Sequence, residues 1–179
     1  MYGFNDYGLI ERKKRPTALK KFIQSHKLKQ SMINELIEDV WCDTEFPELR
    51  KNTWDWLMSR YVPTHTINKP IRLYRGTTQL NTRMWSWTTS LGVAKWFAHR
   101  NYEHLAMAFA EQMPDTPPPP SIILEGVIKP NGILFVCNAR KEQEVVINGA
   151  DEWLESPTTI EEIKSGLAGL KNNNSKGDK

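Results

Sequence analysis

The chain has 179 residues, of which 39% are hydrophobic and seven are Trp, so it is the size of one domain with a sizeable core. This composition excludes a mainly disordered protein. No stretch approaches the roughly 20 apolar residues of a membrane span, and the first residues lack the pattern of a secretory signal. We therefore expect a cytoplasmic protein without membrane contact.

The net charge of +3 is unevenly distributed. Residues 1–30 contain eight Lys or Arg against Asp6 and Glu11, a net of +6, which leaves −3 for the remainder. A basic end of this kind suits an acidic protein surface or a nucleic acid, and a solvated helix face explains it as well. Cys42 and Cys137 lie far apart in sequence and form no metal-type spacing, so we expect two buried free thiols.

The first third of the chain has the apolar periodicity of helices. Pro16 and Thr17 suit the start of one helix, and a further helix is expected after Asp43-Thr44, ending near Tyr61. Between them, one helical face is formed by Leu28, Met32, Ile33, Leu36, Ile37, Val40 and Trp41. We assign residues 1–66 to a helical N-terminal region whose apolar stripes face the core.

From about residue 70 the pattern changes to short strands. Ile71-Arg72-Leu73-Tyr74-Arg75 alternates and stops at Gly76, and Trp85-Ser86-Trp87-Thr88-Thr89 is a second run. Ser90 can cap a helix over 91–99, and a helix over 103–113 is expected next. After the break at 117–120, the remaining expected elements are strands over 122–128, 133–137 and 144–147, a short helix near 158–170 starting at Thr158 or Thr159, and a disordered tail over 171–179.

These elements predict an α+β protein, in which a helical N-terminal region precedes a β-rich body over 67–170 that is compact with it. Several common sites are missing from the sequence. There is no Gly-x-Gly-x-x-Gly, no phosphate-binding loop ending in Gly-Lys-Ser/Thr and no His-Glu-x-x-His. The four histidines form no close group with Cys or carboxylates, so no metal site is predicted.

Three segments carry side chains suited to chemistry. The first is Leu73-Tyr74-Arg75-Gly76, in which an arginine ends an otherwise apolar strand. A guanidinium donates two parallel hydrogen bonds and so suits a pair of phosphates, and Gly76 allows backbone to approach a ligand. A solvent-facing arginine at a strand end is the plainer interpretation.

The second segment is Ser86-Trp87-Thr88-Thr89-Ser90, which places four hydroxyls within five residues. Such hydroxyls can serve a ribose or a nearby carboxylate, although a strand edge followed by a helix cap explains them too. The third is Glu142-Gln143-Glu144, which leads into an apolar strand. Alternation along that strand would place Glu142 and Glu144 on one side and Gln143 on the other.

In this order, the three segments resemble the Arg–Ser–Glu class of mono-ADP-ribosyltransferases. The motifs are most similar to those of small phage-encoded and bacterial members that modify arginine: Leu-Tyr-Arg-Gly, Trp-Thr-Thr-Ser-Leu and Glu-Gln-Glu. The resemblance covers about residues 70–148, with 15 and 54 positions separating Arg75, Ser90 and Glu144 in turn. One departure is Thr88, where the usual Ser-Thr-Ser has its first serine.

The resemblance implies a split β-sheet core that binds NAD as a co-substrate without a metal. Arg75 and Gly76 would hold the phosphates, while Thr88, Thr89 and Ser90 would support the nicotinamide ribose and the carboxylate. Glu144 would stabilise the positive charge that develops on the ribose, and Glu142 would orient and deprotonate the acceptor. An aromatic ring should stack on nicotinamide, and the candidates near in sequence are Trp87, Trp96 and Phe97.

The family pattern makes arginine on a protein the expected acceptor, because glutamate stands at the first position of Glu-x-Glu. The basic N-terminal end keeps RNA or DNA open as the acceptor, and simple NAD hydrolysis is a further alternative. A non-enzymatic basic binding module, which would bind no NAD, also remains. As a role, the resemblance implies a toxin or a phage–host conflict factor, with an antitoxin or a host protein as a further partner.

Overall fold

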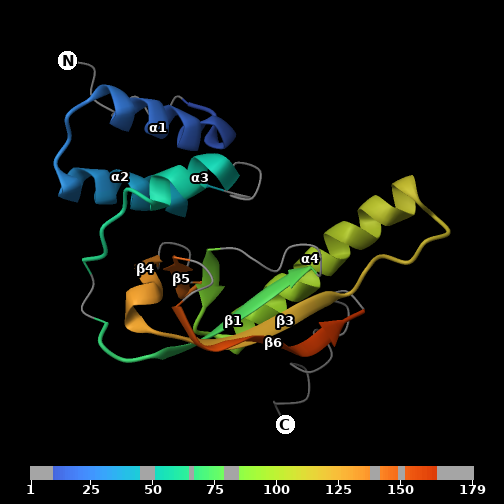
Figure 1. The fold of residues 1–179 in the computed structure, drawn as a ribbon. Coiled ribbons are helices and arrows are strands. Elements are labelled where there is room, and N and C mark those ends of the chain that lie inside the picture. The colour runs from blue at the N-terminus through green and yellow to red at the C-terminus, as the bar shows by residue number, and fades with distance from the viewer. Residues whose placement is uncertain are drawn as a thin grey trace, which may run out of the picture.

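The computed structural model describes residues 10–44, 51–64, 67–78, 85–137, 142–148 and 152–164. These residues form four α-helices and a six-stranded antiparallel sheet, so the α+β class is confirmed. The N-terminal helices form one layer, and the sheet with the remaining helix forms the rest of the molecule (Figure 1). Within the described part, no helix combines the length and the apolar character that crossing a membrane requires.

The N-terminal layer consists of α1 (Arg15–Ser25), α2 (Gln30–Cys42) and α3 (Lys51–Met58). The first two match the predicted helices, with Pro16 in the first turn of α1. The third matches the predicted run through Trp54, and residues 45–50 before it lie outside the described residues. The core-facing prediction is confirmed for Ile37, Val40 and Trp41 on α2, which are at most 2% exposed.

The sheet contains β1 (Ile71–Thr78), β2 (Ser86–Thr88), β3 (Ser121–Ile128), β4 (Ile133–Cys137), β5 (Glu144–Ile147) and β6 (Trp153–Ile163). Their order is β4-β5-β2-β1-β3-β6. β1 and β3 pair along their whole length, whereas β1 and β2 meet at the single pair Tyr74↔Thr88. The short contact between β1 and β2 divides the sheet into two arms, β4-β5-β2 and β1-β3-β6.

A shared apolar core joins the inner faces of the two arms. Leu73 of β1, Trp87 of β2, Ile128 of β3 and Val145 of β5 all belong to it and are nearly fully buried. On the opposite, outer face, α1–α3 pack on the β4-β5-β2 arm through Phe135 and other residues. The site segments at the ends of β2 and β5 therefore lie beside the helical layer (Figure 1).

Helix α4 (Leu91–Gln112) covers the outer face of the β1-β3-β6 arm. Two helices were predicted here, over 91–99 and 103–113, and the structure joins them into one. Residues 100–102 contain neither Gly nor Pro, so nothing in them interrupts the helix. Ala94 and Ala98 are fully buried against the sheet, where their small side chains permit a close approach.

The short helix predicted near 158–170 is wrong for the residues that are described. Residues Trp153–Ile163 form strand β6, which pairs with β3. Thr158, Thr159 and Ile160 are β-branched, and this stiffness favours a strand where hydroxyls alone had indicated a helix cap. β6 is an edge strand, and its charged side chains and Pro157 are typical of protected edges. The predicted disordered tail over 171–179 lies outside the described residues.

The prediction of two free thiols is also wrong, because Cys42 and Cys137 form a disulfide. The bond joins the last residue of α2 to the last residue of β4, across 95 positions of sequence. Their Cα atoms are 6.5 Å apart, which is within the range of disulfides in proteins. The packing of α2 on the β4-β5-β2 arm brings the two cysteines together, so no local sequence pattern could predict the bond.

Candidate functional site

The three segments singled out in the sequence lie on three neighbouring strands, in the order β5-β2-β1. Glu144 pairs with Thr88, and Thr88 pairs with Tyr74, so the three residues form one row across the sheet. Directly paired residues of antiparallel strands point to the same face and lie about 5 Å apart at their Cα atoms. The fold therefore brings the hydroxyl segment (residues 86–90) and the carboxylate segment (residues 142–144) into direct contact.

Hydrogen bonds connect these two segments side by side. The Thr88 hydroxyl donates to the carbonyl oxygen of Glu142 at 2.8 Å, and the Thr89 hydroxyl donates to the Gln143 side-chain oxygen at 3.0 Å. The Thr89 N–H also reaches the Gln143 carbonyl oxygen at 3.4 Å. Two threonine hydroxyls thus fix the turn that leads into Glu144.

Gln143 has a backbone φ of 49°, the left-handed region that residues other than glycine rarely adopt. Strand β5 begins at Glu144, so Glu142 lies before the strand. The predicted alternation of Glu142 and Glu144 along one strand face is therefore wrong, because the chain bends between them. Backbone strain of this kind costs of order 1–3 kcal/mol and is concentrated at functional sites. Here it brings a half-buried Glu142 beside the start of β5.

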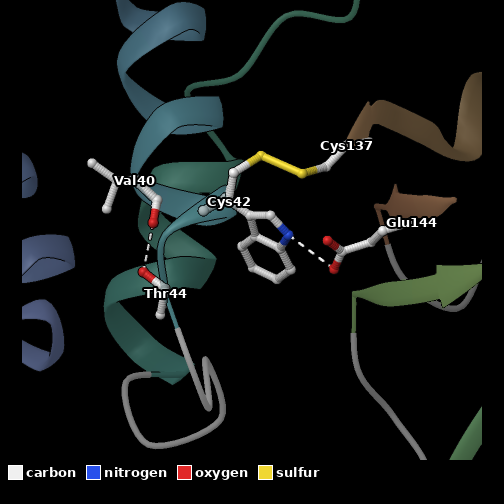
Figure 2. Close-up of a disulfide and its surroundings, with 6 residues drawn as sticks. Val40, Cys42, Thr44, Cys137 and Glu144 are labelled. Atoms are coloured by element: carbon white, nitrogen blue, oxygen red, sulfur yellow. Dashed lines mark hydrogen bonds between the residues drawn. A yellow bond between two sulfur atoms is a disulfide. The ribbon is translucent and has the colours of Figure 1, made fainter. Parts of the chain in front are cut away.

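The Glu144 carboxylate is 5% exposed, which is unusual for a glutamate. Trp41 on α2 donates its indole N–H to Glu144 Oε1 at 3.0 Å, and both groups are buried. Figure 2 shows this hydrogen bond beside the Cys42–Cys137 disulfide. An ion or acid removed from water needs such a partner, because desolvation otherwise costs several kcal/mol.

Ser90 begins α4 in addition to ending the hydroxyl segment. Its hydroxyl accepts the N–H of Val93 at 3.3 Å, and its own N–H donates to the Thr88 hydroxyl at 3.1 Å. The prediction that Ser90 caps a helix is confirmed. The N-terminal turn of α4 therefore lies next to Thr88 and the row that contains Glu144.

Arg75 is one residue beyond that row, on the opposite face of β1. Leu73 points into the core between the two arms, and Gly76 lies against α4, so alternation places Arg75 on the inner side. Its Nη1 donates to the carbonyl oxygen of Ser86, at the start of β2. The structure thus connects Arg75 to the Thr-Thr-Ser strand through the backbone, and places Glu144 on the other face.

The other three predicted ligand-binding residues have packing roles. A Cβ added to Gly76 would stand 1.9 Å from the Ala94 carbonyl oxygen, so this glycine permits the close approach of α4. Trp87 is 4% exposed and packs against Trp153 in the core between the arms, with ring centroids 4.7 Å apart. Phe97 is half-buried on α4 and contacts Trp96.

Trp41 is a site residue that the sequence analysis did not identify. Its position on an apolar helical stripe indicates the core, and that burial is correct. Its partner Glu144 is 103 positions away, so no spacing could connect the two. The only signal available was chemical: a buried indole N–H needs an acceptor, and the acceptor had to be sought elsewhere in the chain.

The arrangement offers a carboxylate held by a donor, a second carboxylate within two residues, and hydroxyls paired beside them. Such a set can stabilise a developing cation and accept a proton. Among the described residues, no group of three His, Cys, Asp or Glu side chains is placed to hold a metal ion. No protein-family model matches the chain, and neither does any curated protein or solved structure.

Proposed function

We propose that this chain transfers ADP-ribose from NAD to arginine on a target protein and releases nicotinamide. One observation carries the proposal: a buried glutamate, Glu144, lies in register with Thr88 at the meeting point of β5, β2 and β1. These are the strands that carry the Glu-Gln-Glu, Thr-Thr-Ser and Leu-Tyr-Arg-Gly segments. The three strands are neighbours in the sheet, in the order β5-β2-β1.

In the proposed reaction, the bond between ribose C1′ and the nicotinamide nitrogen breaks, and nicotinamide leaves with the electron pair. Positive charge then develops on the ribose, as in glycoside cleavage. Glu144 stabilises that charge and accepts the ribose 2′-hydroxyl hydrogen bond. A carboxylate with restricted water access serves this role well, because electrostatic interactions strengthen when water is excluded.

The acceptor nitrogen of arginine then bonds to C1′, and the proton that it loses passes to Glu142. Glu142 is half-buried, next to the left-handed turn at Gln143. Arg75, on the other face of β1, contributes through its bond to the Ser86 carbonyl, which keeps β2 beside β1. Thr88 and Thr89 hold the turn that presents both glutamates.

Transfer of label from adenine-labelled NAD into a cell lysate tests the proposal. We expect Glu144→Gln to lower both transfer and nicotinamide release by at least about 100-fold, because it removes the charge that stabilises the ribose cation. Glu142→Gln should lower transfer by about 100-fold and leave nicotinamide release in the absence of acceptor within a few-fold of wild type. Arg75→Ala should raise KM for NAD.

Glu162→Gln is the matched control, since Glu162 is an exposed residue of β6 that pairs with Lys164. It should transfer label as wild type does. Label that is lost on nuclease treatment would place the acceptor on RNA or DNA. Full activity in Glu144→Gln would show that the carboxylate takes no part in the reaction. No transfer and no nicotinamide release from the wild type would contradict the enzyme and favour a binding module.

A further inference from the structure

One side chain of the N-terminal helical layer, that of Trp41, contacts the proposed site. Trp41 lies in the last turn of α2, is 2% exposed, and donates its indole N–H to Glu144 Oε1 at 3.0 Å. We propose that Trp41 is a positioning residue that fixes the Glu144 carboxylate where it stabilises the positive charge on the NAD ribose, an inference that rests on the function proposed above. The helical layer then forms part of the catalytic apparatus.

The chemistry of the indole suits this role. A Trp Nε1–H group only donates hydrogen bonds, so it favours an oxygen of an ionised carboxylate. The bond then holds the carboxylate in one orientation. A carboxylate has about four acceptor positions on its two oxygens. One bond at Oε1 therefore orients Glu144 and leaves the group able to accept the ribose 2′-hydroxyl as well.

The indole itself is held firmly. Its ring packs edge-on against Trp54, Trp85 and Phe135, with ring centroids at 4.8, 6.1 and 6.3 Å. Close-packed aromatic neighbours restrict the ring to one rotamer. The direction in which the N–H points is therefore set before any substrate binds.

A covalent bond reinforces the same contact. Cys42, the residue after Trp41, is bonded to Cys137, and Cys137 is the residue of β4 that pairs with Glu144 of β5. The donor and the acceptor of the hydrogen bond are thus each adjacent to one end of the disulfide (Figure 2). This arrangement limits how far α2 can move from β5, and a site that must be held to within a fraction of an ångström needs such support.

Trp41→Phe in the full chain tests the proposal, because it removes the N–H and keeps an aromatic ring. We expect kcat for nicotinamide release to fall by about 10- to 100-fold, as a lost hydrogen bond to a charged group predicts, with KM for NAD within about two-fold. Trp56→Phe is the control. Trp56 of α3 packs against the same core, with its ring beside Lys20 and Arg60.

Trp56→Phe should keep kcat within about three-fold of wild type, while the lost packing lowers the thermal midpoint. Wild-type kcat in Trp41→Phe would overturn the proposal, as would a change in KM alone. Equal losses of kcat in both variants would also overturn it, because they would reflect packing.

A spectroscopic measurement separates this inference from the function on which it rests. The Trp41 indole N–H resonance, assigned by its absence in Trp41→Phe, should move in Glu144→Gln because a neutral amide oxygen is a weaker acceptor. An unmoved resonance would overturn the contact itself. A moved resonance in a wild type that releases no nicotinamide would overturn the proposed function and the positioning role, and leave the contact as a structural one.

Discussion

At the scale of single residues, Glu144 joins burial to a specific donor. A carboxylate that is 5% exposed is costly unless hydrogen-bonded, and Trp41 provides such a bond. The neighbouring Gln143 has a left-handed backbone, and the hydroxyl and N–H of Thr89, the residue after β2, bond to it. A buried carboxylate and a left-handed backbone thus occur at adjacent residues, and such local energetic costs are typical of functional sites.

Tyr61 provides a second buried polar contact, in the same core as Trp41. Burial raises the pKa of its phenol above the usual range, and the hydrogen bond to Glu38 raises it further. In the unfolded chain the Tyr61 phenol ionises near pH 10, whereas in the folded chain it is still neutral at that pH. The stability that Tyr61 contributes is therefore complete below about pH 10 and is lost as pH rises from there towards the higher folded pKa.

We expect the free energy of unfolding of the wild type to fall more steeply above pH 10 than that of Tyr61→Phe, by up to about 1.4 kcal/mol per pH unit. Urea unfolding at pH 8, 10 and 11 measures this difference. The values at pH 8, where the phenol is neutral in both states, correct for lost packing and the lost bond to Glu38. Equal slopes for the two proteins would contradict the prediction.

At the scale of elements, α4 packs directly on the backbone of β1. Gly76 allows it: an added Cβ would stand 1.9 Å from the Ala94 carbonyl oxygen and 2.5 Å from the Ala98 nitrogen. Both are main-chain atoms of a long helix and cannot move alone. The same contact brings the N-terminal turn of α4, with Ser90, beside Thr88. The position of the hydroxyl segment therefore depends on how closely α4 and β1 approach each other.

We predict that Gly76→Ala lowers the free energy of unfolding by about 3 kcal/mol or more, because α4 must shift away from β1. Chemical denaturation measures the loss. Gly92→Ala is the matched control: it lies exposed in the first turn of α4, and the nearest atom to its added Cβ is the Ser90 hydroxyl at 3.7 Å. That variant should be as stable as wild type or about 0.5–1 kcal/mol more stable. Wild-type stability in Gly76→Ala would refute the close approach.

At the scale of the whole molecule, the helical layer and the β4-β5-β2 arm share one apolar core. Leu19 of α1, Ile37 of α2 and Leu57 of α3 pack with Phe135 of β4 and Val146 of β5. The disulfide crosses the same boundary, from Cys42 to Cys137. Folding of α1–α3 is thus coupled to folding of the sheet, and the proposed site lies at their junction.

Reducing the disulfide should destabilise the whole chain. The bond closes a loop across 95 positions, for which the chain-entropy model gives about 4.7 kcal/mol and a loss of roughly 10–20 °C in thermal midpoint for a protein of this size. Thermal unfolding with and without a thiol reductant measures the effect. The double variant Cys42→Ser/Cys137→Ser should match the reduced protein and not respond to reductant. A midpoint that is insensitive to reductant in the wild type would contradict the prediction.

Local sequence patterns were enough to predict most of the helices and strands. The periodicity over 28–41 predicted α2, the alternation over 71–75 predicted β1, and the apolar runs predicted β3 to β5. They were also enough to select the three segments that the fold places on neighbouring strands. The helix predicted near 158–170 was wrong over 158–163, where Thr158 and Thr159 suit a helix cap and a strand alike and the pairing with β3 decides. Prediction also failed at Gln143, whose left-handed turn is held by bonds from Thr89.

The sequence by itself determined the α+β class, the three N-terminal helices, the strands β1 to β5 and the chemical groups available to a site. Those features depend on residues within a few positions of one another, whose spacing sets which face of an element is apolar. Only the tertiary structure decided that Cys42 bonds to Cys137, that Trp41 donates to Glu144, and that Arg75 and Glu144 occupy opposite faces. The first two pair residues about a hundred positions apart, and the third follows from strand register, so packing of the entire chain had to specify them.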